Sequence, residues 1–275
     1  MALQGIAYKI AAEKLSVEYE DKDGSYLALE DASFNVREGE FLSIVGPSGC
    51  GKSTLLSVLQ GLKQPTNGVA LLDGKPITSA GADRAAVFQH YSLFPWMTAR
   101  GNISFAVGQA KRNTTRRQRD DIANSFLTEV GLKGFENKYP FQLSGGMQQR
   151  VAIARALAMD SDVLLMDEPF GAIDVKNRTA MQELLLSLWE GDGESRKTVV
   201  FVTHDIDEAI FLSDRILMIA GRPGRIVEEI TVPYPRPRFH DALVAEESYF
   251  KLRRKLVSLF LNDVQDRIGG EEVML

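Results

Sequence analysis

A glycine-rich loop between a predicted strand and a predicted helix constrains this chain more than any other feature. The loop has the sequence Gly46-Pro47-Ser48-Gly49-Cys50-Gly51-Lys52-Ser53-Thr54 and fits the pattern G-x-x-x-x-G-K-[ST]. The apolar run Phe41–Val45 before it predicts a buried strand, and Leu55, Leu56, Val58 and Leu59 after it predict a helix. The chain therefore needs an α/β core in which a strand delivers the loop to a helix N-terminus.

The residue types in this loop predict that it binds a nucleoside triphosphate. Glycines let backbone N–H groups point at phosphate oxygens, and the positive end of the helix dipole adds to the attraction. Lys52 is expected to reach the β- and γ-phosphates, and the Ser53 hydroxyl is expected to be a ligand of Mg²⁺. A chance glycine-rich turn is the alternative, and the flanking strand and helix patterns disfavour it.

Charge and composition exclude several classes of function. The net charge is −5, so no overall positive field attracts nucleic acid, and the basic cluster 111–119 is interleaved with polar residues, as on a solvated helix face. The single cysteine, Cys50, fits a reducing compartment. Neither a signal peptide nor an apolar run long enough to span a membrane is recognisable, so we expect a membrane role only through a partner.

The pattern of apolar residues changes along the chain. It predicts strands at 15–19, 32–36, 41–45, 69–72, 86–88, 163–166, 198–202, 216–219 and 225–230, and helices after the glycine-rich loop and at 120–130, 147–159, 179–189, 206–212 and 248–266. The segment 91–158 is mainly helical. We therefore predict one α/β domain, 11–235, with a helical insertion at about 91–158 and a helical C-terminal extension, 236–275.

Two adjacent carboxylates, Asp167 and Glu168, end the predicted strand 163–166. Carboxyl ends of strands in an open α/β sheet face the ligand crevice, whereas two neighbouring charges at the edge of a core are hard to explain structurally. Asp167 is expected to hold Mg²⁺, and Glu168 to orient and deprotonate the attacking water. Helix capping by one of the two acids is the structural alternative.

The segment Leu143–Gln149 predicts a second anion site at a helix N-terminus. Ser144 is a natural N-cap, and Gly145 and Gly146 leave the backbone bare. Capping alone explains the serine but not both glycines. We expect this bare N-terminus, with Gln148, to meet the γ-phosphate of a nucleotide held by another protomer.

Two polar residues follow other predicted strands. His204 lies after the strand 198–202 and is expected to contact the γ-phosphate, although an isolated histidine at a strand end is more often structural. Gln89 follows the strand 86–88 and is expected to sense Mg²⁺ and the attacking water. Taken alone, Gln89 has the character of an ordinary polar loop residue.

These motifs together resemble the nucleotide-binding subunit of an ATP-binding cassette (ABC) transporter. In family terms they are Walker A at 46–54, the Q-loop at Gln89, the signature at 143–149, Walker B at 163–168, the D-loop ending at Asp174, and the switch His204. The resemblance covers about residues 15–230. It implies a P-loop NTPase (RecA-like) core, an antiparallel β subdomain and an inserted α-helical subdomain that carries the signature.

The resemblance also implies an assembly and a set of ligands. It implies a head-to-tail homodimer with two ATP molecules, each between Walker A of one subunit and the signature of the other, with both sites hydrolytic. The catalytic residues would be Glu168, His204, Gln89 and Lys52, the Mg²⁺ ligands Ser53, Gln89 and Asp167, and Asp174 would line the nucleotide site. An aromatic residue that stacks on adenine is expected before Walker A, and Tyr19 fits best, with Tyr26 as the alternative.

Three segments resemble the nitrate, sulfonate and taurine importer branch. These are 93–98, 167–174 and 222–227. The branch implies a peripheral subunit on the cytoplasmic face of the inner membrane that binds permease subunits and, indirectly, a solute-binding protein. Pro95 and Trp96 would contact the permease, or Trp96 would instead pack beneath the helical insertion.

Two other functions were weighed, and some questions stay open. A soluble ABC ATPase acting on DNA or ribosomes would usually show paired cassettes or basic arms, and an exporter cassette is disfavoured by the importer-like tail. The sequence leaves open which solute is carried. It also leaves open whether Arg236, Arg238 and the last helix serve dimerisation, regulation or stability alone.

Overall fold

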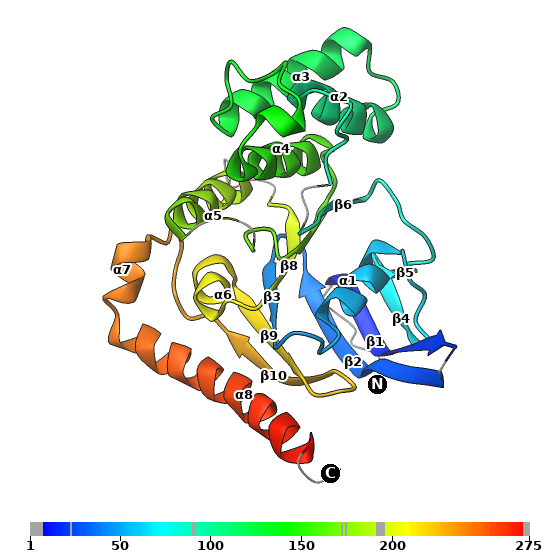
Figure 1. Cartoon of the computed structure of the whole chain (residues 1–275), viewed down its shortest axis with the longest axis vertical. Helices are drawn as coiled ribbons and strands as arrows, with labels where there is room; N and C mark the ends of the chain where they lie inside the picture. The colour runs from blue at the N-terminus through cyan, green and yellow to red at the C-terminus, as the bar shows by residue number, and fades with distance from the viewer. Residues whose placement is uncertain are drawn as a thin grey trace. The chain divides into compact units, whose positions relative to one another are not determined.

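The structure is a computed structural model that describes residues 8–22, 24–89, 92–171, 173, 175–190 and 196–271 (Figure 1). Its chain contacts divide it into two units. The first unit combines the residues up to Ala80 with those from Val200 onward, and the second unit is Gly81–Val199. Strand β8 (Thr198–Thr203) crosses the boundary.

The first unit contains the strand and the helix that flank the glycine-rich loop, and the described residues of the C-terminal part of the chain. Its elements are β1 (Tyr8–Asp21), β2 (Gly24–Arg37), β3 (Phe41–Val45), α1 (Lys52–Gln60), β4 (Asn67–Leu72), β5 (Lys75–Pro76), the end of β8, α6 (Ile206–Leu212), β9 (Arg215–Ala220), β10 (Arg225–Thr231), α7 (His240–Val244) and α8 (Glu247–Glu271).

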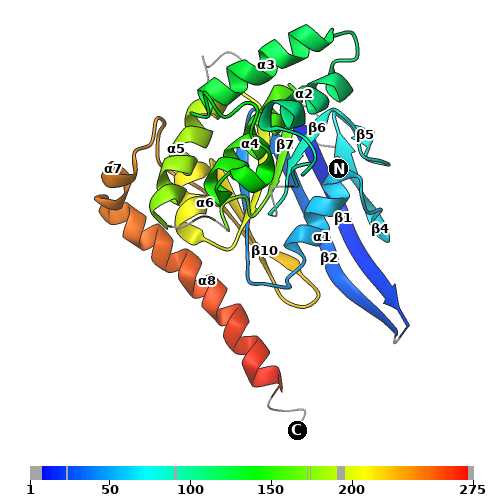
Figure 2. The same cartoon turned by 45° about the horizontal axis from the view of Figure 1, so that its top comes forward.

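An antiparallel sheet in the first unit has the strand order β2-β1-β4-β5. The long strands β1 and β2 pair along most of their length and form the ribbon seen in Figure 2. In their register Tyr19 is opposite Tyr26. The alternation of apolar and polar residues predicted at 15–19 and 32–36 corresponds to these two strands, whose inward residues Leu15, Val17 and Phe34 are buried.

The parallel strands of the first unit bring the loop and the end of β8 to one edge of a sheet. The order is β10-β9-β3-β8, with β3 parallel to β9 and Val45 opposite Met218. Every residue of β3, β8 and β9 is buried, as expected for parallel strands covered on both faces. The C-terminal helix α8 contacts α6 and β9 (Figure 1).

The second unit is a short parallel sheet followed by a helical insertion. Its elements are β6 (Arg84–Val87), α2 (Ala99–Ala110), α3 (Arg116–Glu129), the 3-10 helix η1 (Pro140–Gln142), α4 (Gly145–Ala158), β7 (Val163–Asp167), α5 (Val175–Glu190) and the start of β8. Strand order is β8-β7-β6, and β6 is parallel to β7. Helices α2, α3 and α4 share one apolar core, in which Ile103, Leu127 and Val151 are fully buried.

Most predicted elements are present, and the α/β class with an antiparallel sheet and a helical insertion is confirmed. Helix 206–212 has the predicted bounds, and the others start or end within a few residues of them, as fraying helix ends allow. Helices α2 and α7 were not predicted. In α2 the buried Asn102 interrupts the apolar stripe, because its amide donates to Phe94 O and Met97 O and its Oδ1 accepts from Phe94 N.

Candidate active site

The glycine-rich loop joins β3 to α1 without a side-chain cap on the helix. The N-cap residue is Gly51 at φ 90°, in the left-handed region, and it makes no side-chain capping bond. A Cβ at Gly51 would lie 2.7 Å from the carbonyl oxygen of Ala28, so a larger residue there meets backbone. Glycine has no side chain that could cap the first turn of α1, and the N-terminus of a helix offers backbone N–H groups to an anion.

Lys52 is held against the loop that precedes it. Its side chain is buried, and Nζ donates to the carbonyl oxygens of Gly46 at 2.8 Å and Pro47 at 2.9 Å. These bonds use two of the three donors of the ammonium group. The positive charge is thus fixed beside the loop backbone rather than moving on a free side chain.

The turn after β9 packs directly on the loop. A Cβ at Gly46 would lie 2.1 Å from the carbonyl oxygen of Ile219, and a Cβ at Gly224 would lie 1.9 Å from that of Cys50. Arg222 is in the same turn, and its Nη2 would lie 3.0 Å from a Cβ at Gly49. The motif pattern missed this cation. Parallel pairing of β3 and β9 was the signal that could have found it, since the carboxyl ends of parallel strands share an edge.

The two candidate adenine-stacking tyrosines lie together. The rings of Tyr19 and Tyr26 stack with centroids 5.5 Å apart, and Tyr26 is 61% exposed. Tyr19 Oη lies 3.4 Å from Thr54 Oγ1 in the first turn of α1, and Lys63 Nζ lies 4.5 Å from the centre of the Tyr19 ring. Tyr19 therefore reaches the loop, while the choice between the two rings stays a prediction.

In the second unit, Gln89 and Glu168 face each other. Asp167 is the last residue of β7, Glu168 follows it, and Gln89 follows β6, the neighbouring parallel strand. Gln89 Nε2 lies 3.5 Å from Glu168 Oε2, a long hydrogen bond. Glu168 has φ 42°, a left-handed conformation that is costly for a residue with a Cβ and that recurs at functional sites.

Ser144 caps α4 as predicted. Its Oγ accepts from Met147 N at 3.3 Å, and Gln148 Nε2 donates to Leu143 O at 3.1 Å. Ser144 is exposed and Gly145 and Gly146 are half-buried. Apart from its chain neighbours and the backbone of its own helix, a Cβ at Gly146 would have no atom within 4 Å.

His204 is exposed and follows the last residue of β8 in the first unit. The next residue, Asp205, is the N-cap of α6 and accepts from Asp207 N at 2.9 Å and Glu208 N at 3.2 Å. Thr203 Oγ1 donates to Glu208 Oε2 at 2.7 Å and accepts from Asp205 N at 3.0 Å. The backbone on both sides of His204 is therefore fixed by hydrogen bonds.

The predicted site residues divide between the two units. The first unit holds residues 46–54, Tyr19 and His204, and it brings Tyr19 to Thr54. The second unit holds Gln89, Asp167, Glu168 and the N-terminus of α4, and it brings Gln89 to Glu168. Asp174 lies outside the described residues. The roles assigned to all of these residues stay predictions.

Comparison with known proteins decides the family. The ABC transporter family matches residues 29–171. A nitrate import ATP-binding protein, NrtD of Synechococcus elongatus, is 48% identical over 84% of this chain and 83% of its own length. The chain belongs to the ABC transporter family. It is an ATP-binding subunit of that family, and the alternative of an ATPase acting on DNA or ribosomes is set aside.

Other relatives and solved structures agree. A bicarbonate transport ATP-binding protein, CmpD of Synechocystis sp., is 43% identical over 92% of this chain and 89% of its own length. An ABC transporter ATP-binding protein of Methanocaldococcus jannaschii without an assigned function is 44% identical over 93% of this chain and 92% of its own.

The structural neighbours are nucleotide-binding cassettes. A dimeric ATP-binding cassette in a post-hydrolysis state with ADP and Pi has a TM-score of 0.72 at 33% identity, covering 82% of this chain and 100% of its own. The cassette cbiO1 from Clostridium perfringens, part of a transporter complex, has a TM-score of 0.70 at 27% identity, covering 89% and 93%. The P-loop cassette fold and an ATPase activity are thereby confirmed.

Proposed function

We propose that this ATPase is the energy-coupling subunit of an importer for nitrate, sulfonate, taurine or a similar small solute. The observation that carries the solute class is the 48% identity to a nitrate import protein, supported by the relative that transports bicarbonate. Both relatives act on small anions, as their names state. The chain itself does not contact the solute in this proposal, so the assignment is to a branch and not to one compound.

The proposed working unit is a homodimer with two ATP molecules at its interface. The N-terminus of α4 in one protomer would cover the phosphates on the α1 loop of the other. Three features support this arrangement: Ser144 is exposed, a Cβ at Gly146 would point into open space beyond the backbone of its own helix, and a cassette of similar structure is a dimer. In this arrangement the γ-phosphate of ATP contacts both protomers. ATP would therefore bind the closed dimer more tightly than the open one, and this difference in affinity would close the dimer.

The chemistry of hydrolysis divides among four side chains. Lys52 would neutralise charge on the β- and γ-phosphates, and Glu168 would accept the proton of the attacking water. Gln89, whose Nε2 lies 3.5 Å from Glu168 Oε2, would orient the same water. His204 would hold the γ-phosphate, and closure of the dimer would exclude bulk water.

The donor set fits Mg²⁺. The Ser53 hydroxyl, the Gln89 amide and the Asp167 carboxylate all offer oxygen, the ligand that Mg²⁺ prefers. Among the described residues, no group of three or more His, Cys, Asp or Glu side chains could hold a metal ion. In nucleotide sites Mg²⁺ is typically bound by one or two protein groups together with phosphates. When bound, the ion would neutralise charge on the phosphates.

The proposed permease contact is an aromatic surface after Gln89. Trp96 is 69% exposed, so the alternative that it packs beneath the helical insertion loses support. Phe94 contacts both Trp96 and the partly exposed Phe105, with ring centroids 5.4 and 5.2 Å apart. Exposed aromatic groups of this kind mark protein contacts.

None of the described helices is long and apolar enough to cross a membrane. We place the subunit on the cytoplasmic face of the inner membrane, bound to a permease that receives solute from a binding protein.

The substitution Glu168→Gln tests the proposed chemistry. We expect ATP binding to be retained, kcat to fall by about 10²–10⁴-fold because the general base is lost, and the dimer to persist with ATP. Binding is measured with a fluorescent ATP analogue, hydrolysis by phosphate release, and dimerisation by light scattering after size exclusion. Normal turnover by this variant would remove Glu168 from its assigned role.

Purification from native membranes tests the proposed transport role. The tagged chain is isolated after detergent solubilisation, and the proteins that co-elute are identified. We expect a stoichiometric multi-spanning permease, whose binding protein can then be screened with nitrate, bicarbonate, taurine and sulfonates. Recovery without a permease, from the soluble fraction alone, would contradict the transport assignment and leave the ATPase intact.

A further inference from the structure

The C-terminal extension holds α6, the helix that begins two residues after His204. The linker that follows β10 contacts the C-terminal end of α6, and α8 contacts its N-terminal end. All of these residues belong to the first unit. The contacts of Arg236, Arg238 and the last helix therefore indicate what these parts of the chain do.

Two arginines of the linker satisfy the carbonyl groups at the end of α6. Arg238 is buried, and its Nη1 donates to Ile210 O at 3.1 Å and Ser213 O at 2.7 Å. Arg236 Nη2 donates to Leu212 O at 2.5 Å, and its Nε to Asp214 Oδ1 at 2.8 Å. Carbonyl groups at a helix end lack partners within the helix and carry the negative end of its dipole, so two cations there stabilise α6.

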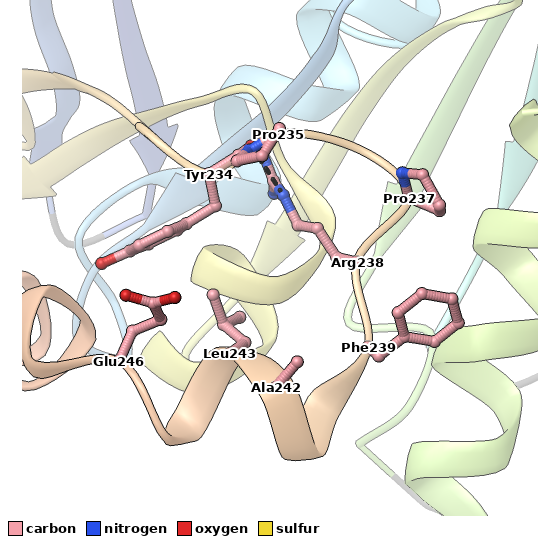
Figure 3. A pocket seen from close by; sticks show the side chains of 8 residues that line it. All are labelled: Tyr234, Pro235, Pro237, Arg238, Phe239, Ala242, Leu243 and Glu246. Atoms are coloured by element: carbon pink, nitrogen blue, oxygen red, sulfur yellow. Dashed lines mark hydrogen bonds between the residues drawn. The ribbon is translucent and has the colours of Figure 1, made fainter.

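The linker folds back on itself, so that its own backbone orients the side chain of Arg238. Its Nε and Nη2 donate to Tyr234 O at 3.1 and 2.8 Å. Figure 3 shows this side chain reaching back to Tyr234 beside a pocket of about 140 Å³. Near the same end of α6, the ring of His240 stacks on that of Phe211 with centroids 3.6 Å apart.

Helix α8 holds the first turn of α6 through Asp207. Arg253 donates to both carboxylate oxygens of Asp207, from Nε at 2.7 Å and from Nη2 at 3.2 Å, a paired geometry that fixes orientation as well as charge. Tyr249 Oη donates to Asp207 Oδ1 at 2.5 Å. Burial and the hydrogen bond to Asp207 raise the pKa of Tyr249, which keeps the phenol protonated as a donor.

The same part of α8 borders the space beside His204. A cavity of about 270 Å³ is lined by His204, Asp205, Ile206 and Asp207 on one side, and by Arg253 and Phe260 of α8 on the other. The fixed carboxylate of Asp207 is three residues from His204. The backbone between His204 and Asp207 is held by two hydrogen bonds, from Asp205 N to Thr203 Oγ1 and from Asp207 N to Asp205 Oδ1. A shift of the first turn of α6 therefore moves His204 as well.

We propose that Arg253 and Tyr249 are positioning residues for hydrolysis, which act by fixing the first turn of α6 and thereby the location of His204. The C-terminal extension then sets the catalytic competence of the nucleotide site without touching the nucleotide. This inference rests on the role of His204 given under the proposed function. A misplacement of a catalytic group by about 1 Å can lower a rate up to ~10²-fold, so contacts of this kind are sufficient to control turnover.

The first experiment compares kcat and KM for Mg·ATP in the full-length chain. Arg253→Ala and Tyr249→Phe are tested against Lys251→Ala, which removes a cation of the same helix whose ion pair is an exposed one with Glu247. We expect Arg253→Ala to lower kcat about 10-fold with KM nearly unchanged, because the α1 loop that binds phosphate is untouched. Tyr249→Phe should have a smaller effect, Arg253→Lys should restore part of the rate, and Lys251→Ala should match the parent.

His204→Ala separates failure of this inference from failure of the proposed function. If His204→Ala turns over normally, the role of His204 is wrong. If His204→Ala is inactive while Arg253→Ala keeps the parent kcat, the role of His204 stands and the positioning inference is overturned. Equal losses of kcat in Arg253→Ala and Lys251→Ala would also overturn it.

Histidine ring NMR gives a readout that a purely structural role would not move. The chain has three histidines, His90, His204 and His240, so the ring signals can be assigned by single His→Gln substitutions. We expect Arg253→Ala to shift or broaden the His204 signal, with His90 as reference and His240 as the reporter of the other end of α6. An unchanged His204 signal in Arg253→Ala would contradict the proposal.

Discussion

The N-termini of α1 and α4 are both predicted to bind phosphate, yet they are built in opposite ways. Helix α1 starts at Gly51 with no side-chain cap, whereas α4 starts at Ser144, whose hydroxyl accepts from Met147 N. Lys52 of α1 is buried and Ser144 is exposed. The lysine that starts α1 is thus held inside its own chain, whereas the serine that caps α4 is open to solvent.

The glycines at the two helix N-termini, Gly51 before α1 and Gly146 in α4, also differ in whether their own chain requires them. Gly51 is required by its own chain, because its φ is 90° and a Cβ would lie 2.7 Å from Ala28 O. Gly146 is not required, because a Cβ there would meet nothing within 4 Å and alanine is the better helix former. The conformation of Gly51 is therefore explained within one chain. We attribute the glycine of α4 to the nucleotide of the partner in the proposed dimer.

Gly51→Ala is expected to have the largest effect, because it tests whether the backbone geometry at the start of α1 binds phosphate. Alanine at a left-handed position costs about 1–2 kcal/mol, and the contact with Ala28 O adds to that cost. We expect ATP affinity to fall by roughly 100-fold or more, the scale on which loss of a preorganised donor acts. Titration with a fluorescent ATP analogue measures the affinity, and thermal melting measures the stability. Parent-like affinity would show that the α1 geometry is not what binds phosphate.

Gly146→Ala is the matched change in α4, with a smaller expected effect. A single chain should bind ATP normally and should gain up to about 1 kcal/mol of stability from the better helix former. ATP-driven dimerisation and hydrolysis should fall about 10-fold, because the Cβ would stand between the helix and the nucleotide of the partner. Light scattering with ATP and phosphate release measure both. Unchanged dimerisation would contradict an intermolecular role for Gly146.

Substitution of Ser144 gives the smallest effect and separates capping from phosphate contact. Ser144→Ala should cost about 1 kcal/mol of stability through the lost cap, seen as a lower melting temperature. Ser144→Asp should keep that stability, since aspartate caps equally well, but should impair ATP-driven dimerisation by charge repulsion with the γ-phosphate. If Ser144→Asp dimerises with ATP like the parent, Ser144 does not approach phosphate.

How far the sequence predicted the structure differs between local and non-local features. Strand β3 and helix α6 have the predicted bounds, because a short apolar run and a cap at Asp205 are local signals. Helix α2 was not predicted, because the buried Asn102 occupies a position that an apolar pattern requires. Its hydrogen bonds to the preceding loop are satisfied only in the folded chain.

The candidate site shows the same division. The spacing of glycines, Lys52 and Ser53 specifies a phosphate loop within nine residues. The two acids, one ending β7 and one following it, are specified by their position at a strand end. By contrast, the sequence presents Arg222 only within the segment 222–227, which resembles the importer branch. Its place against Gly49 follows from the pairing of β3 with β9.

The sequence by itself determined the nucleotide chemistry of this protein, since the loop, the caps and the strand-end acids are each encoded by a few neighbouring residues. Only the tertiary structure decided which distant groups support that chemistry. Arg253 meets Asp207 across 46 residues, and Tyr19 meets Thr54 across 35. Such contacts leave no periodicity or spacing in the sequence, because they depend on how helices and strands pack and not on the local conformation of the chain.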